Sequence, residues 1–155
     1  MKKSFIIFSL ILMTFMISGC GCSKDKKEDI KTVTCKLNEE ENSYRIDSTI
    51  TIKYDSKENE VFSLEENSIL TSENEEIRKN FITINDNVYS NYGKYYSSLM
   101  NEENAQMKIS LDFSEISVDK FIEFDEFNSD FLTDDKIDFE KMLEYYSEFN
   151  NYECE

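Results

Sequence analysis

The chain of 155 residues has no histidine, no tryptophan and no proline, and it has only three glycines. Without histidine, Ser-His-Asp and Cys-His catalysis are excluded, as is any metal site that uses imidazole. Two of the glycines lie in the first 21 residues, which leaves too few for a glycine-rich phosphate loop further along. Positive charge is scarce too. The 17 lysines and arginines against 33 aspartates and glutamates argue against nucleic acid as a partner.

Residues 1–19 are typical of a bacterial lipoprotein signal peptide. Lys2 and Lys3 form a basic start, and residues 5–17 form an apolar run that is too short to span a membrane. The run ends in the sequence ISGC at residues 17–20, which resembles a lipobox. By this resemblance Cys20 becomes the first mature residue and carries diacylglycerol on its sulfur. The alternative is an ordinary signal peptide, whose removal releases the whole protein.

A lipidated Cys20 predicts a location on the extracytoplasmic face of the cell membrane. Each buried CH₂ of an acyl chain contributes about 0.8 kcal/mol, so two or three chains hold a domain durably on a bilayer. Residues 20–30 continue as a short charged tether that separates the domain from the lipid. The membrane is therefore one expected partner. The net charge of −16 favours a cationic peptide or protein as another.

Residues 31–155 are expected to form a single α+β domain, because no repeat and no flexible linker interrupts them. Apolar residues alternate with polar ones in three neighbouring segments that read as an antiparallel β-meander. The segments are 31–37, 43–55 and 61–71. Ser48 is the one polar residue on the apolar side of the second segment. Another alternating segment, 107–113, predicts a further strand.

Two helices are expected to cover one face of this mainly antiparallel sheet. Ser72 and Glu75 fit a capping box, and an apolar stripe with helical spacing follows as far as Leu99. Residues 85–87 and Gly93 are poor helix formers, so a kink or an early end of this long helix is the alternative. A C-terminal helix is expected to start at residues 133–135.

The cysteines beyond the lipobox suggest a disulfide. Cys35 lies in the first predicted strand and Cys154 lies next to the chain end. An exported domain meets oxidising surroundings in many bacterial envelopes, and a bond between these two would join both ends of the fold. The alternative is a pair of buried reduced thiols. A redox enzyme is disfavoured because the chain has no CxxC motif.

The order of these features resembles the YehR-like lipoproteins of low-GC Gram-positive bacteria. The resemblance rests on the lipobox, the strand with Cys35, the alternating run of residues 44–54, the following helix, the strand at Met107 and the terminal helix that ends at residues 152–154. It implies a small α+β lipoprotein domain. It implies no catalytic residue, because the family has no established activity.

Three kinds of candidate site remain. The acidic segment 125–136 suggests calcium, although it lacks the ligand spacing and the glycine of an EF-hand. Carboxylate pairs such as Asp134-Asp135 suggest a hydrolase, but general acid catalysis needs a buried carboxyl with a raised pKa, and these pairs lie in polar turns. Tyrosines gather in two predicted helices, where they either bind a partner or belong to the core and its boundary. They are Tyr89, Tyr92, Tyr95, Tyr96, Tyr145 and Tyr146.

We therefore expect a lipid-anchored, non-enzymatic envelope protein that binds a partner or ligand, with no catalytic residue, no metal and no cofactor. A calcium-binding module and an accessory hydrolase are the alternatives. The composition is compatible with all three, because neither charge nor spacing identifies a ligand.

Overall fold

The computed structural model describes residues 29–155. The predicted signal peptide, Cys20, Cys22 and nearly all of the tether lie outside the described residues. Among the residues that are described, no helix combines the length and apolar character needed to cross a membrane.

Three long strands form the meander that the sequence predicts. They are β1 (Ile30–Glu41), β2 (Tyr44–Asp55) and β3 (Glu60–Thr71), and both pairings are antiparallel. Alternation places one set of side chains on the core face, where Cys35, Ile50 and Ile52 are fully buried. The opposite face is largely polar, with Thr49 and Thr51 among its side chains. Within residues 29–155, the core therefore lies on one side of the sheet.

Three further strands complete a six-stranded sheet in the order β4-β5-β3-β2-β1-β8. The strand predicted near Met107 is β5 (Asn104–Asp112), and it pairs with β3. The edges are β4 (Tyr96–Met100) and the two-residue β8 (Glu153–Cys154). Every pairing is antiparallel.

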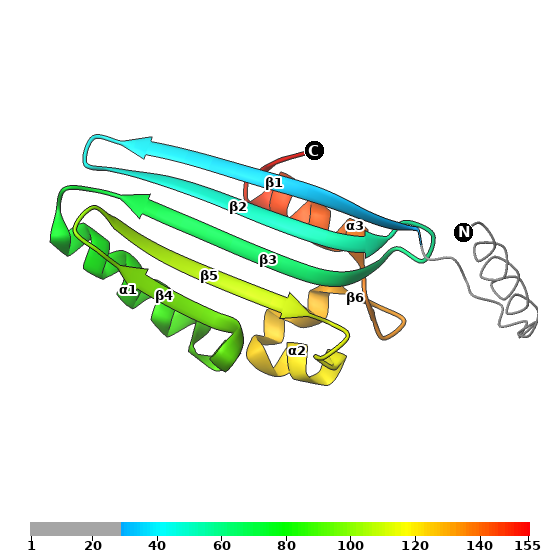
Figure 1. Cartoon of the computed structure of the whole chain (residues 1–155). Helices are drawn as coiled ribbons and strands as arrows, with labels where there is room; N and C mark the ends of the chain where they lie inside the picture. The colour runs from blue at the N-terminus through cyan, green and yellow to red at the C-terminus, as the bar shows by residue number, and fades with distance from the viewer. Residues whose placement is uncertain (1–28) are drawn as a thin grey trace, which may run out of the picture.

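Helical segments pack on one face of this sheet, so the predicted α+β class is confirmed (Figure 1). The α-helices are α1 (Glu75–Tyr89), α2 (Val118–Phe124) and α3 (Phe139–Glu144). Short helical turns follow each of them. These are η1 (Ser90–Tyr95), η2 (Glu126–Phe131) and the π-helical turn η3 (Tyr145–Phe149).

The predicted helix of residues 72–99 is shorter than expected at both ends. Asn74, not Ser72, caps α1, with its Oδ1 accepting the Glu76 N–H at 2.9 Å. Ser72 instead donates to the Ser43 carbonyl at 2.6 Å. The helix ends at Tyr89. Gly93 then takes φ 55° and ψ −123°, a backbone conformation that glycine adopts readily and other residues avoid.

The apolar stripe of α1 is only partly covered. The helix packs mainly against β4 and β5 at one edge of the sheet, so its outer side overhangs that edge. Ile84 is 63% exposed and Val88 is 51% exposed as a result. Leu99, the last residue of the expected stripe, lies in β4 and is also 63% exposed.

The predicted start of the C-terminal helix at residues 133–135 is wrong. Asp134 and Asp135 have positive φ and form the turn between β6 (Leu132–Thr133) and β7 (Lys136–Ile137). The helix begins after Asp138, whose carboxylate accepts the Lys141 N–H at 3.1 Å. Aspartate tolerates the left-handed conformation that such a turn requires, so an Asp pair suits a hairpin as well as a helix start.

Candidate functional site

A cavity of about 260 Å³ lies between the sheet and the helical layer. Its floor comes from β3 and β5, and its walls come from the end of α1, from α2 and α3, from all three short helical turns and from the segment before β8. A cavity of about 150 Å³ accommodates benzene, so this one has room for roughly ten non-hydrogen atoms. The lining side chains are Leu64, Glu66, Val88, Tyr89, Tyr92, Ile109, Leu111, Phe121, Asp125, Phe127, Asn128, Phe131, Met142, Tyr145, Tyr146, Asn150 and Tyr152.

Glu66 is the unexpected residue in this cavity. It lies opposite Ile50 on the core face of β3, in the same alternation as Leu64 and Leu70, and it is only 9% exposed. Burial raises the pKa of Glu66 from 4.5 to about 7, and a hydrogen bond with Ser68 only partly offsets this effect. The domain therefore holds a carboxyl group that is about half protonated at neutral pH.

A chain of hydroxyl groups leads away from Glu66 along the core face. The Ser48 hydroxyl donates to Ser68 Oγ at 2.7 Å, since these two residues lie opposite each other on β2 and β3. A further hydrogen bond joins Ser48 to Tyr152. The polar residue that interrupts the predicted apolar face of β2 is therefore part of a buried polar network around Glu66.

Five tyrosines line the cavity together with Glu66, namely Tyr89, Tyr92, Tyr145, Tyr146 and Tyr152. Burial is the main cause of the raised pKa of Tyr89, Tyr92, Tyr146 and Tyr152, and the nearby charge of Glu66 raises all four further. For Tyr152 the pKa reaches about 12. These phenols remain protonated at physiological pH, so the wall of the cavity is aromatic and uncharged.

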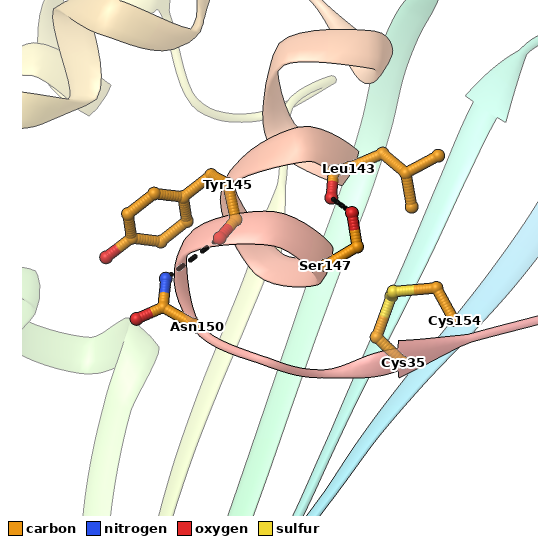
Figure 2. Close-up of a disulfide and its surroundings, with 6 residues drawn as sticks. All are labelled: Cys35, Leu143, Tyr145, Ser147, Asn150 and Cys154. Carbon is orange, nitrogen blue, oxygen red and sulfur yellow. Dashed lines mark hydrogen bonds between the residues drawn. A yellow bond between two sulfur atoms is a disulfide. The ribbon is translucent and has the colours of Figure 1, made fainter.

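The π-helical turn η3 places two neighbouring tyrosines in this wall. Asn150 donates two hydrogen bonds to the Tyr145 carbonyl, through its backbone N–H at 3.2 Å and through Nδ2 at 3.0 Å (Figure 2). The Tyr152 N–H donates to the Tyr146 carbonyl at 2.9 Å. Such wide turns occur often at functional sites. Here the turn brings Tyr145 and Tyr146 to the same cavity.

Asn128 fixes the opposite wall. It is 5% exposed, and its Nδ2 donates to the Phe121 carbonyl at 2.7 Å and to the Tyr92 hydroxyl at 3.3 Å. Tyr92 in turn stacks on Phe124, with ring centres 4.7 Å apart. The side chain of Tyr92 is therefore held on both its polar and its apolar parts.

The mouth of the cavity lies at Val88, Phe127 and Asp125, which are the exposed members of its lining. The Asp125 carboxylate accepts the Phe127 N–H at 3.0 Å and so caps η2. Within the described lining, Glu66 and Asp125 carry the carboxyl groups, and no lysine or arginine accompanies them. The site combines negative charge with aromatic walls.

The structure brings Cys35 and Cys154 together as a disulfide, with an S–S distance of 2.04 Å (Figure 2). The two residues lie opposite each other on β1 and β8, and their neighbours Thr34 and Glu155 exchange both backbone hydrogen bonds. The cysteines thus occupy a non-hydrogen-bonded position, where facing side chains approach most closely. The disulfide holds the segment that carries Tyr152.

The acidic residues considered for calcium or hydrolysis do not converge. Asp125 caps η2, whereas Asp134 and Asp135 form the β6–β7 turn. In the described part of the chain, no cluster of three or more cysteine, aspartate or glutamate side chains is arranged to hold a metal ion.

Of the residues that matter in this site, the sequence identified Tyr89, Tyr92, Tyr145 and Tyr146 but missed Glu66. The neighbouring polar residues at positions 65–67 weakened the strand pattern and hid it. The alternation itself contained the signal, because Glu66 occupies an apolar-side position of β3, between Leu64 and Leu70. Ser48 occupies an apolar-side position of the neighbouring strand in the same way.

Comparison with known proteins yields one structural similarity. No protein-family model matches the chain, and no curated protein matches it. An NMR structure of a protein from Streptococcus pneumoniae TIGR4 is similar over 92% of this chain and 94% of that chain, with 14% sequence identity and a TM-score of 0.46. A similarity at this level says nothing about what this protein does.

Proposed function

We propose that the protein is a lipid-anchored envelope lipoprotein whose domain binds a small ligand in the cavity above Glu66, without catalysing its conversion. The buried Glu66 is the observation that carries the binding site. Glu66 has no basic side chain beside it in the described cavity lining, and burial makes its ionised form costly. Residues kept at a cost to stability are found at binding and catalytic sites.

The shape and lining of the cavity support the same proposal. Binding sites are concave and mostly apolar, with a few polar groups at fixed positions. Glu66 and Asn128 are such groups, and the tyrosines supply rigid surface with little conformational freedom to lose. The acidic composition supports a positively charged partner, whether it is a peptide or a protein.

Anchoring through Cys20 and membership of the YehR-like family belong to this proposal and rest on the sequence motifs. We expect Cys20→Ala to abolish incorporation of radiolabelled palmitate and to remove the protein from the membrane fraction of cells, because the thiol is the site of acylation. Cys22→Ala is the matched control, since it removes a thiol two residues away and should keep both properties. Labelling that survives in Cys20→Ala, or is lost in Cys22→Ala, would contradict the proposed anchor.

Ligand binding in the cavity is tested at its mouth. Val88→Trp should reduce by about tenfold or more the binding of small probes that raise the melting temperature of the full-length protein, since the indole would lie across the opening. Suitable probes are benzyl alcohol, benzoate, butylamine and choline. Ile84→Trp changes another exposed apolar residue one turn earlier on α1, outside the cavity lining, and should bind the probes as the parent does. If no probe stabilises the parent, or if Val88→Trp binds unchanged, the cavity is not the binding site.

A hydrolase is the second candidate, and Glu66 itself favours it. General acid catalysis uses a buried carboxyl with a pKa near 7, which describes this group. Glycoside hydrolysis also needs a second carboxylate across the scissile bond, and Asp125 is the only other one in the described lining. Because Asp125 already caps η2, binding is the better-supported function. Turnover of a sugar substrate that is lost in Glu66→Gln would favour the hydrolase.

A further inference from the structure

The cavity has an electrostatic imbalance that a ligand would correct. Its described lining holds the carboxyl groups of Glu66 and Asp125 and no basic side chain. Glu66 is nine-tenths buried, and among residues 29–155 the Ser68 hydroxyl is the group that favours its ionised form. An ionised carboxylate in such surroundings is stabilised most by a positive charge placed beside it.

The wall is suited to that charge. A cation is attracted to the face of a tyrosine ring within about 6 Å of the ring centre, and the attraction grows when water is excluded. Tyr89 and Tyr92 lie with ring centres 5.5 Å apart, and Tyr146 and Tyr152 lie 5.6 Å apart. These two pairs come from α1–η1 and from η3 and the segment after it, and both line the same cavity as Glu66.

We propose that the ligand is a small organic cation, whose ammonium or guanidinium group lies against the Glu66 carboxylate inside the tyrosine wall. This inference rests on the proposed use of the cavity as a binding site. The cavity volume of about 260 Å³ limits the part that is enclosed to roughly ten non-hydrogen atoms. A bare metal ion fits less well, since the described residues offer no cluster of three acidic or cysteine ligands.

Binding of such a cation is expected to depend on pH, because only ionised Glu66 attracts it. A group with a pKa of about 7 is ionised about ten times more at pH 8 than at pH 6, so affinity should rise about tenfold over this interval. The other titratable groups in the described lining are phenols, apart from the carboxyl group of Asp125. These groups are Tyr89 of α1, Tyr92 of η1, Asp125 before η2, Tyr145 and Tyr146 of η3, and Tyr152 before β8.

The test compares ligands that differ only in charge. Choline and 3,3-dimethylbutan-1-ol have the same shape. Butylamine and butan-1-ol have the same chain length and differ in the group at its end. They are titrated into full-length protein in maltoside micelles at pH 8, up to about 20 mM, with binding followed by NMR or calorimetry. At least one cation should bind tenfold or more tightly than its neutral counterpart. Glu66→Gln should remove that preference and the pH dependence, while keeping the binding of the neutral alcohol.

Other outcomes separate this inference from the proposed function. If the alcohols bind as tightly as the cations, or if Glu66→Gln binds choline and butylamine as the parent does, the inference that the ligand is a cation is wrong, and the cavity remains a binding site. If no probe binds the parent, the binding site itself is wrong and the cation falls with it. A third arm identifies the source of the charge. N-acetyl-lysine methylamide binding as tightly as butylamine supports a protein-borne cation, and weaker binding supports a free one.

Discussion

Glu66→Gln is expected to raise the free energy of unfolding by roughly 3 kcal/mol at pH 8 and to change it little below pH 4.5. In the folded protein burial raises the pKa of Glu66 to about 7, against 4.5 in the unfolded chain. Between these values the folded state binds the proton more strongly, so the carboxyl group makes the protein less stable as the pH rises. The cost is complete above pH 7 and absent below 4.5. Glutamine has the same shape and carries no charge at any pH.

Urea unfolding of both proteins at about pH 4.5, 6 and 8 measures this difference. Glu65→Gln is the matched control, because Glu65 precedes Glu66 on β3, faces the solvent with 56% of its side chain exposed, and makes only a distant ion pair with Lys108 at 3.8 Å. It should change stability by less than about 0.5 kcal/mol at every pH. A loss of stability in Glu66→Gln at pH 8 would mean that the carboxylate stabilises the fold and is not retained for a ligand.

Removal of the Cys35–Cys154 disulfide is expected to cost about 4–5 kcal/mol of stability, near the upper end for such bonds, because the two residues are 119 positions apart. The double variant Cys35→Ala, Cys154→Ala isolates this effect from the reactivity of free thiols. Denaturant unfolding of oxidised and reduced parent and of the double variant measures it. Reduction should destabilise the parent and leave the double variant unchanged.

The same variant should also weaken ligand binding in the cavity. β8 is only two residues long, and without the disulfide it is held to β1 by few backbone bonds, among them the pair between Thr34 and Glu155. Tyr152, two residues earlier, is part of the cavity wall. If the reduced protein is as stable as the oxidised one and binds choline equally well, then the chain end does not shape the site.

The four long strands β1, β2, β3 and β5 could be predicted from the sequence because their apolar residues alternate over long stretches. β2 is the clearest example, and its pairing with β1 and β3 follows from the short turns between them. The end of α1 could not be predicted in the same way. The residues from Tyr89 to Leu99 keep helical spacing, but Gly93 reverses the chain and the last of them pair with β5 instead. The spacing of residues along the chain does not show that a partner strand is present, and it is pairing with that strand that makes these residues a strand instead of a helix.

The cavity was beyond sequence reasoning for a related reason. Glu66, Tyr92 and Tyr146 come from a central strand and from two short helical turns that are far apart in the chain. Their convergence depends on the strand order β4-β5-β3-β2-β1-β8, in which β3 lies beside β5 and not at an edge. The tyrosines could be recognised as candidates from their clustering. Their common target could not, because a single glutamate between polar neighbours has no distinctive pattern.

The carboxyl-carbon chemical shift of Glu66, followed by NMR across a pH titration with and without butylamine, tests the central claim most directly. The account predicts a midpoint near pH 7 in the free protein, against an ordinary value of 4.5, and a clear fall of that midpoint when the cation is bound. A midpoint near 4.5 that butylamine does not move would contradict it.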